Sequence, residues 1–154
     1  MKVCKFGGSS VAEAAQIRKV KAIVERDPSR RVIVVSAPGK RHKQDEKITD
    51  LLYTCHAKVE KGEPIDTSFD IIRSRFLEIA RELKVSSSLE KAIDQVEEKI
   101  KAGASADYAA SRGEYLSGML IAEFLGAEFV DAEKVVRLTD DGRVHENSYQ
   151  LVAK

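Results

Sequence analysis

The stretch that decides the fold is KVCKFGGSS, at residues 2–10. Its first part, Lys2 to Phe6, is short and partly apolar, and it runs directly into Gly7 and Gly8. This pattern predicts a β-strand that ends in a tight loop. Apolar residues then recur at helical spacing across residues 11–24, so the loop is expected to lead into an amphipathic helix.

A second strand is expected at residues 31–36, RVIVVS. The run from Val32 to Val35 is entirely β-branched and shows no alternation of apolar and polar residues. Such a run is typical of a strand that is buried on both faces, as in a parallel sheet covered by helices. The order strand, helix, strand therefore predicts an α/β fold with a mainly parallel sheet.

Four further helices are expected, because apolar residues recur at helical spacing across residues 48–59, 69–83, 89–100 and 107–125. Ser10, Thr67 and Ser87 are candidate helix N-caps, and Gly126 is a suitable residue to end the last helix. Short strands are expected at residues 127–130 and 135–138, the second closed by a turn at residues 141–142. So few strands against five helices make the sheet incomplete in this chain.

Composition restricts the class of function. The chain has 154 residues, which is room for one domain or for one piece of a larger one. Its 26 Lys and Arg residues nearly balance 25 Asp and Glu residues, so no global charge favours nucleic acid or an anionic membrane. No stretch approaches the roughly 20 apolar residues of a membrane-spanning helix.

The cysteines and histidines predict no metal site. Cys4, Cys55 and three scattered histidines fit no zinc-ligand spacing. We expect two reduced thiols, packed as small hydrophobic side chains in a cytoplasmic protein.

The first candidate site is the glycine turn with its flanking residues, Lys5 to Ser10. Glycines at a strand end let the backbone approach a ligand closely, N–H groups at a helix start attract an anion, and Lys5 adds a full positive charge. The lysine precedes the glycines, so this is not the phosphate-binding pattern in which lysine follows them. On spacing alone, an ordinary glycine turn with a surface lysine fits equally well.

Three single residues are further candidates. Ser36 ends the second strand and would face the same sheet edge as the glycine turn, where ligands gather in open α/β sheets. Thr49 lies early in a helix, and Glu114 follows Gly113, a glycine inside a helical pattern that suggests a close approach to the helix. Taken singly, each residue also has an ordinary structural interpretation. The Ser36 hydroxyl could cap a loop, and Thr49 and Glu114 could be solvated helix residues. The basic cluster at residues 40–43 lacks aromatic residues for base stacking and fits a solvated loop.

Taken together, four segments resemble the amino acid kinase family, and within it the aspartate kinases. They are KFGGSSVA at residues 5–12, VVSA at 34–37, ITDLL at 48–52 and RGEYLS at 112–117, in the family's order and approximate spacing. The resemblance implies a three-layer αβα sandwich around a mainly parallel sheet. It also implies ATP-dependent phosphorylation of the side-chain carboxylate of L-aspartate, the first step of lysine, threonine and methionine biosynthesis.

The resemblance also implies a role for each candidate residue. Lys5 would contact the transferring phosphoryl group, the N–H groups of Gly7, Gly8 and Ser9 would cradle it, and Ser36 would stand at the mouth of the same pocket. Thr49 and Glu114 would bind aspartate, with Glu114 facing the substrate ammonium. ATP and Mg²⁺ would be used by the full-length enzyme, and a homo-oligomer is expected.

Two departures from the family pattern matter. The loop between Ala37 and Ile48 is basic and lacks the small Ser/Gly run of many relatives. The family's later Arg-Gly-Gly-Ser-Asp segment, which completes the aspartate site and holds the metal, is absent. Residues 1–154 are therefore expected to be the N-terminal portion of the catalytic domain, inactive alone, without the nucleotide-binding half and the ACT regulatory domains. The alternatives are a sister kinase acting on glutamate, acetylglutamate, carbamate or UMP, and a non-catalytic anion-binding domain.

Overall fold

A computed structural model describes residues 1–85 and 88–153 of the chain. Strand β1 (Lys2–Phe6) pairs in parallel with strand β2 (Arg30–Val35), and helix α1 (Ala14–Glu25) connects them. In this register Phe6 lies opposite Val35, and both side chains pack against the hydrophobic core. The predicted strand–helix–strand unit with a parallel sheet is therefore confirmed.

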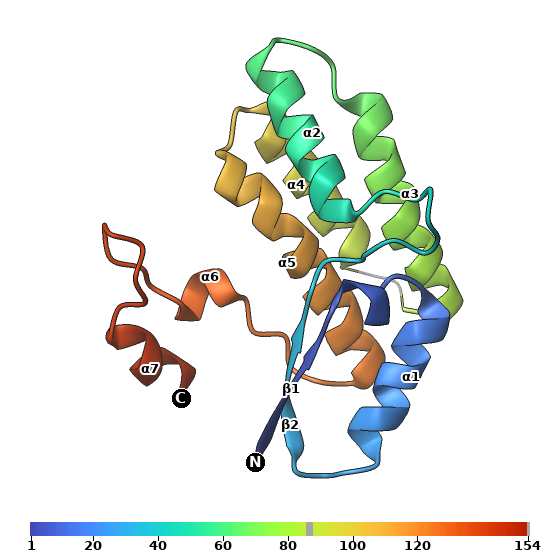
Figure 1. The fold of residues 1–154 in the computed structure, drawn as a ribbon, viewed down its shortest axis with the longest axis vertical. Helices are drawn as coiled ribbons and strands as arrows, with labels where there is room; N and C mark the ends of the chain where they lie inside the picture. The colour runs from blue at the N-terminus through green and yellow to red at the C-terminus, as the bar shows by residue number, and fades with distance from the viewer. Residues whose placement is uncertain (86–87, 154) are drawn as a thin grey trace.

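Helices α2 (Ile48–Glu60), α3 (Asp66–Leu83), α4 (Leu89–Lys101) and α5 (Ala106–Leu125) form a bundle that extends upward from the strands in Figure 1. Helix α5 contacts α2, α3 and α4 and also strand β2, so it joins the bundle to the sheet. The predicted apolar stripes face this core, and burial of each large apolar side chain contributes about 1.5–3 kcal/mol. Its largest fully buried side chains include Leu52, Phe69, Ile72, Phe76, Ile93, Ile100, Leu116 and Leu120.

The predicted helix ends are partly right. Gly126 ends α5 in the left-handed conformation, with a φ of 65°. Ser10 caps no helix, because Gly8–Ser10 forms a separate 3₁₀ turn (η1) and α1 begins four residues later. Thr67 is also wrong as a cap, since α3 begins at Asp66. Ser87 lies outside the described residues.

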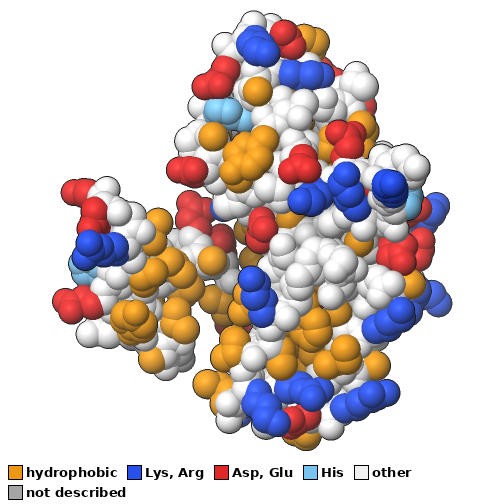
Figure 2. All heavy atoms as spheres, viewed as in Figure 1, with side chains coloured by type: hydrophobic (Ala, Val, Ile, Leu, Met, Phe, Trp, Pro, Cys, Tyr) orange, Lys and Arg blue, Asp and Glu red, His pale blue; other side chains and the backbone are white. Residues whose placement is uncertain are grey.

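No described helix covers the outer face of the sheet. Val3, Val32 and Val34 are 65%, 39% and 43% exposed, although all three are apolar. Figure 2 shows hydrophobic side chains over the two strands on this face. The prediction that the second strand is buried on both faces is therefore wrong for residues 1–154, because helices cover only its inner face here.

The segment after α5 extends from the bundle as an arm (Figure 1), which contains the short helices α6 (Ala132–Val135) and α7 (Asn147–Val152). Phe129 attaches it to α5 by an edge-to-face contact with Tyr115, at 5.6 Å between ring centroids. The predicted strands at residues 127–130 and 135–138 do not form, and only Leu138 bridges to Val144 around the predicted turn. Apolar runs without a neighbouring strand cannot satisfy a ladder of backbone hydrogen bonds.

Hydrophobic side chains gather on the side of the arm that faces the bundle, and charged ones on its outer side (Figure 2). Among the described residues, no helix is both long enough and apolar enough to cross a bilayer.

Candidate active site

Three chain segments meet in a cleft of about 550 Å³ at the carboxyl ends of the two strands. They are the glycine turn after β1, the loop after β2 and the first turn of α2 (Figure 1). The lining residues are Gly8, Ser9, Ser36, Ala37, Pro38, Gly39, Lys40, Lys47, Thr49 and Asp50. Sequence analysis predicted this edge of the sheet, because parallel strands present their carboxyl ends on the same side.

Two glycines hold the first two segments together. The N–H of Gly39 donates to the carbonyl oxygen of Gly8 at 2.9 Å. A Cβ atom on Gly39 would lie 2.8 Å from the carbonyl carbon of Gly8, and one on Gly8 would lie 3.0 Å from the oxygen of Ala37. Gly8 therefore allows a close approach of backbone, as predicted, but the backbone that approaches belongs to this chain. A Cβ on Gly7 would meet only open space.

Backbone hydrogen bonds position Ser36 and Thr49 at the cleft. The N–H of Ser36 donates to the carbonyl oxygen of Phe6 at 3.1 Å, which continues the pairing of the strands into the cleft. The N–H of Ile48 donates to the carbonyl oxygen of Pro38 at 3.2 Å, which sets the start of α2 against the loop. Ile48 and Leu52 are buried in the core, so the half-buried Thr49 is left to line the cleft.

The lining does not include Lys5, Gly7 or Glu114, although all three lie in the described part of the chain. Lys5 is exposed on the outer face of β1, opposite Val34. Glu114 is exposed on α5. The structure therefore brings Gly8, Ser9, Ser36 and Thr49 together and leaves the other three predicted residues outside the cleft.

Gly113 explains how α5 supports this site. A Cβ atom on it would lie 2.6 Å from Cβ of Ala37 and 3.3 Å from Cγ2 of Ile48. The close approach that the sequence suggested at Gly113 is thus made by the wall of the cleft itself. Glu114, the next residue, is carried by the helix turn that packs against this wall.

The basic cluster divides into two parts. Lys40 lines the cleft, as does Lys47 at the end of the same loop. Arg41 instead binds the carboxylate of Asp45, with Nε to Oδ2 at 2.9 Å, and reaches Glu78 on α3 at 3.2 Å. The hydrogen bond from the Arg41 side chain holds the pKa of Asp45 well below its ordinary value. Residues 40–43 are all exposed, as expected of a solvated loop, but Arg41 is anchored by its ion pairs.

Sequence reasoning missed Gly39, Lys40, Lys47 and Asp50 as lining residues. Gly39 could have been found from its position directly after Pro38 in a loop. A glycine there has no side chain, so another backbone segment can approach it closely. The lysines offered only their charge as a signal, and a run of charges usually marks a solvated surface.

The described residues do not form a metal centre, since no three His, Cys, Asp or Glu side chains among them gather closely enough to hold an ion. Phosphoryl-transfer enzymes hold Mg²⁺ through carboxylates together with phosphate oxygens of the nucleotide. The residues at hand do not fit that donor set, and we assign no Mg²⁺ ligand in this chain.

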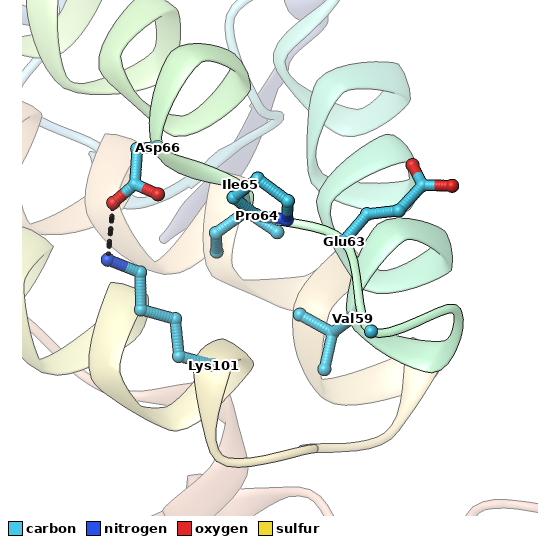
Figure 3. Close-up of a pocket in the computed structure, with 7 residues that line it drawn as sticks. Val59, Glu63, Pro64, Ile65, Asp66 and Lys101 are labelled. Carbon is cyan, nitrogen blue, oxygen red and sulfur yellow. Dashed lines mark hydrogen bonds and ion pairs between the residues drawn. The ribbon is translucent and has the colours of Figure 1, made fainter.

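A second hollow of about 290 Å³ lies near the α2–α3 connection (Figure 3). Val59, Pro64 and Ile65 line it, together with Asp66 and Lys101. Nζ of Lys101 is 2.8 Å from a carboxylate oxygen of Asp66 and 2.8 Å from one of Glu97. The cation of this hollow is already neutralised by two carboxylates, which favours a role in joining α4 to α3.

Comparison with known proteins gives consistent matches. The model of the amino acid kinase family matches residues 1–154. Aspartokinase 3 of Bacillus subtilis (strain 168) is 38% identical over 141 residues, which cover 88% of this chain and 31% of that protein. Lysine-sensitive aspartokinase 3 of Escherichia coli (strain K12) is 30% identical over 153 residues, covering 90% of this chain and 32% of that protein.

Solved structures show the same fold. The aspartate kinase of Clostridium acetobutylicum matches with a TM-score of 0.95 and 46% identity, over 99% of this chain and 35% of that one. Escherichia coli aspartokinase III in complex with aspartate and ADP matches with a TM-score of 0.79 and 28% identity, over 98% and 36%. The chain thus spans about a third of the length of the relatives it matches.

Proposed function

The chain belongs to the amino acid kinase family, and we propose that it is the N-terminal portion of the catalytic domain of an aspartate kinase. The reaction would transfer the γ-phosphoryl group of ATP to the side-chain carboxylate of L-aspartate. The observation that carries this proposal is the cleft in which Gly8, Ser9, Ser36 and Thr49 meet. These residues come from three of the four segments that resemble the family.

The glycine turn would hold the transferring phosphoryl group. Phosphoryl transfer needs little covalent help from protein and depends on positioning and on stabilisation of charge. Backbone N–H groups of Gly7, Gly8 and Ser9 would donate to the equatorial oxygens, with Ser36 at the mouth of the cleft. Lys5, two residues before the turn, would add a positive charge by extending its long side chain from the sheet edge.

The opposite wall would hold the amino acid. Thr49 in the first turn of α2 would donate a hydrogen bond to aspartate. Glu114, on the helix turn that supports the wall, would pair with the substrate ammonium and so select an amino acid over a simple dicarboxylate. Lys40 and Lys47 make the cleft more positive, which suits two anionic substrates.

Other features of the proposal concern the whole protein. The nucleotide-binding half and the ACT regulatory domains would come from further segments, and residues 1–154 alone would not turn over. The protein would be cytoplasmic and homo-oligomeric, and it would act at the start of lysine, threonine and methionine biosynthesis. Mg²⁺ would accompany ATP in the full-length enzyme.

The proposal is tested with a panel of acceptors. The full-length protein is incubated with ATP, Mg²⁺ and L-aspartate, glutamate, N-acetylglutamate, carbamate or UMP, and ADP formation is followed. We expect kcat/KM to be highest for L-aspartate by at least an order of magnitude. A preference for another acceptor would assign the chain to a sister kinase, and no acceptor-dependent ADP formation would favour a non-catalytic anion-binding domain.

A further inference from the structure

Helix α3 carries a guanidinium group that is almost fully buried beside the cleft loop, residues 38–47. Arg75 is 2% exposed, and its Nη2 donates to Oδ1 of Asp45 at 2.6 Å. Its Nη1 reaches the carbonyl oxygen of Gly39 at 3.3 Å, and Nη2 also reaches that of Glu46 at 3.4 Å. One side chain therefore contacts the beginning, the interior and the end of the loop.

Both ends of this loop continue directly into the cleft. Gly39 is hydrogen bonded to Gly8 and lies in backbone contact with it, so a shift of Gly39 would move the glycine turn. Glu46 precedes Lys47, which lines the cleft, and the first turn of α2 that carries Thr49 follows. The contacts of Arg75 thus lead to both sides of the substrate cleft.

The arrangement is better suited to fixing a conformation than to adding stability. Removing two charges from water offsets most of the attraction between them, so a buried ion pair is often no more stabilising than apolar residues of similar volume. The pair instead fixes the positions of the groups that it joins. A planar guanidinium binds several acceptors in fixed directions, which an ammonium group does not do. Arg41 holds the same carboxylate from the solvent side, so Asp45 is fixed between two arginines.

We propose that Arg75 is a positioning residue for the substrate cleft. Through Asp45 and the carbonyl groups of Gly39 and Glu46, it holds the cleft loop in the one conformation that places the glycine turn and Thr49 at the right separation. This inference rests on the proposed function, because the proposed function assigns the glycine turn to the phosphoryl group and the wall at Thr49 to aspartate. It adds a residue that contacts neither substrate and lies on a helix outside the family motifs.

The test uses Arg75→Met and Arg75→Lys in the full-length protein, with Arg73→Met as the matched control. Arg73 lies on the same helix and binds Asp94 and Glu97 of α4, each at 2.7 Å, so its loss removes two ion pairs away from the cleft. Each variant is measured for aspartate kinase kcat/KM, for thermal unfolding and for amide hydrogen exchange across residues 39–47.

We expect both Arg75 variants to lower kcat/KM for aspartate by about tenfold or more, because small misplacements of reacting groups are costly. Exchange across residues 39–47 should quicken several-fold, and the melting temperature should fall further than in Arg73→Met, because removing one partner of a buried ion pair leaves the other charge uncompensated. Equal losses of kcat/KM in the Arg75 and Arg73 variants, or unchanged exchange in the loop, would overturn the inference.

The outcomes also separate this inference from the proposed function. A wild-type protein without kinase activity would refute the proposed function, and the exchange measurement would still decide whether Arg75 holds the loop. If Arg75→Met fails to fold, Arg75→Lys, which keeps the charge and most of the volume, carries the same comparison. Asp45→Asn is the third variant and should repeat the quickened exchange, because it weakens the same contact from the loop side.

Discussion

Gly39 and Gly8 meet backbone to backbone, and this contact sets the shape of the cleft. We predict that Gly39→Ala lowers the free energy of unfolding by about 1–3 kcal/mol, because the new methyl group would lie 2.8 Å from the carbonyl carbon of Gly8. Gly7→Ala is the matched control, since a Cβ there meets open space and the φ of −77° suits any residue. Denaturant unfolding compares the two, and equal destabilisation would contradict the contact.

Lys5 carries the charge closest in sequence to the glycine turn. We predict that Lys5→Ala lowers kcat about a hundredfold and changes the aspartate KM little, as expected for a group that stabilises charge mainly in the transition state. Lys2→Ala, at the other end of β1, should keep kcat within about twofold of the wild type, as substitutions away from the site generally do. Steady-state kinetics showing less than a threefold change in kcat for Lys5→Ala would remove Lys5 from the site.

Asp45 gives the cleft loop a pH dependence. Its pKa in the folded protein is held below the ordinary value of an unfolded aspartate by the hydrogen bond from Arg41. The carboxylate therefore stabilises the fold fully above the unfolded pKa, near 4, and the contribution is lost as the pH falls toward the lower folded pKa.

We predict from this sign that Asp45→Asn is less stable than the wild type at pH 7 and that the difference shrinks steadily below pH 4. Melting temperatures of both proteins across pH 3–7 provide the measurement. A difference that stays constant over that range would show that the charge of Asp45 contributes nothing to folding.

At the scale of elements, the sequence predicted what periodicity and β-branching determine. The apolar stripes of α2, α3 and α4 and the parallel pairing of β1 with β2 are all present. Helix starts were predicted less well, because Ser10 and Thr67 match cap chemistry locally while the neighbouring backbone decides where a helix begins. Residues 8–10 turn tightly to bring Gly8 against Gly39, and this tertiary contact leaves no cap for Ser10 to make.

The candidate site was also predicted in part, because local sequence patterns reveal some of its residues and tertiary contacts determine the others. Gly8, Ser9 and Ser36 follow from the rule that ligands gather at the carboxyl ends of parallel strands. Thr49 was a candidate because it lies early in a helix, and only the family resemblance gave it a role. Arg75 and Asp45 could not be predicted, because their contact joins residues 30 positions apart through a helix and a loop of irregular backbone. Neither periodicity nor a local motif marks such a pair.

For the whole molecule, the uncovered face of the sheet determines how residues 1–154 should behave as an isolated polypeptide. The helical bundle supplies a buried core, so we expect this polypeptide to fold. Val3, Val32 and Val34 remain exposed, and a strand edge with an apolar face invites association with another copy.

We predict that isolated residues 1–154 self-associate and form no aspartyl hydroxamate. Light scattering should show that Val32→Thr with Val34→Thr reduces the association, whereas Ile23→Thr, an exposed apolar position on α1, leaves it unchanged. A monomer at high concentration would indicate that the valine face does not drive contacts. Turnover near that of the full-length protein would place a complete active site within these residues.

The central claim is that the side-chain carboxylate of aspartate accepts the phosphoryl group, and an oxygen-isotope measurement tests it most directly. The full-length protein is given ATP, Mg²⁺, hydroxylamine and L-aspartate labelled with ¹⁸O in its side-chain carboxylate. Hydroxylamine attacks the acyl carbon of aspartyl phosphate, the bond from that carbon to the bridging oxygen breaks, and phosphate leaves with that oxygen. We predict one ¹⁸O-labelled phosphate, carrying a single ¹⁸O atom, for each aspartyl hydroxamate formed. Unlabelled phosphate would contradict the account. Such phosphate would come from hydrolysis of ATP by water.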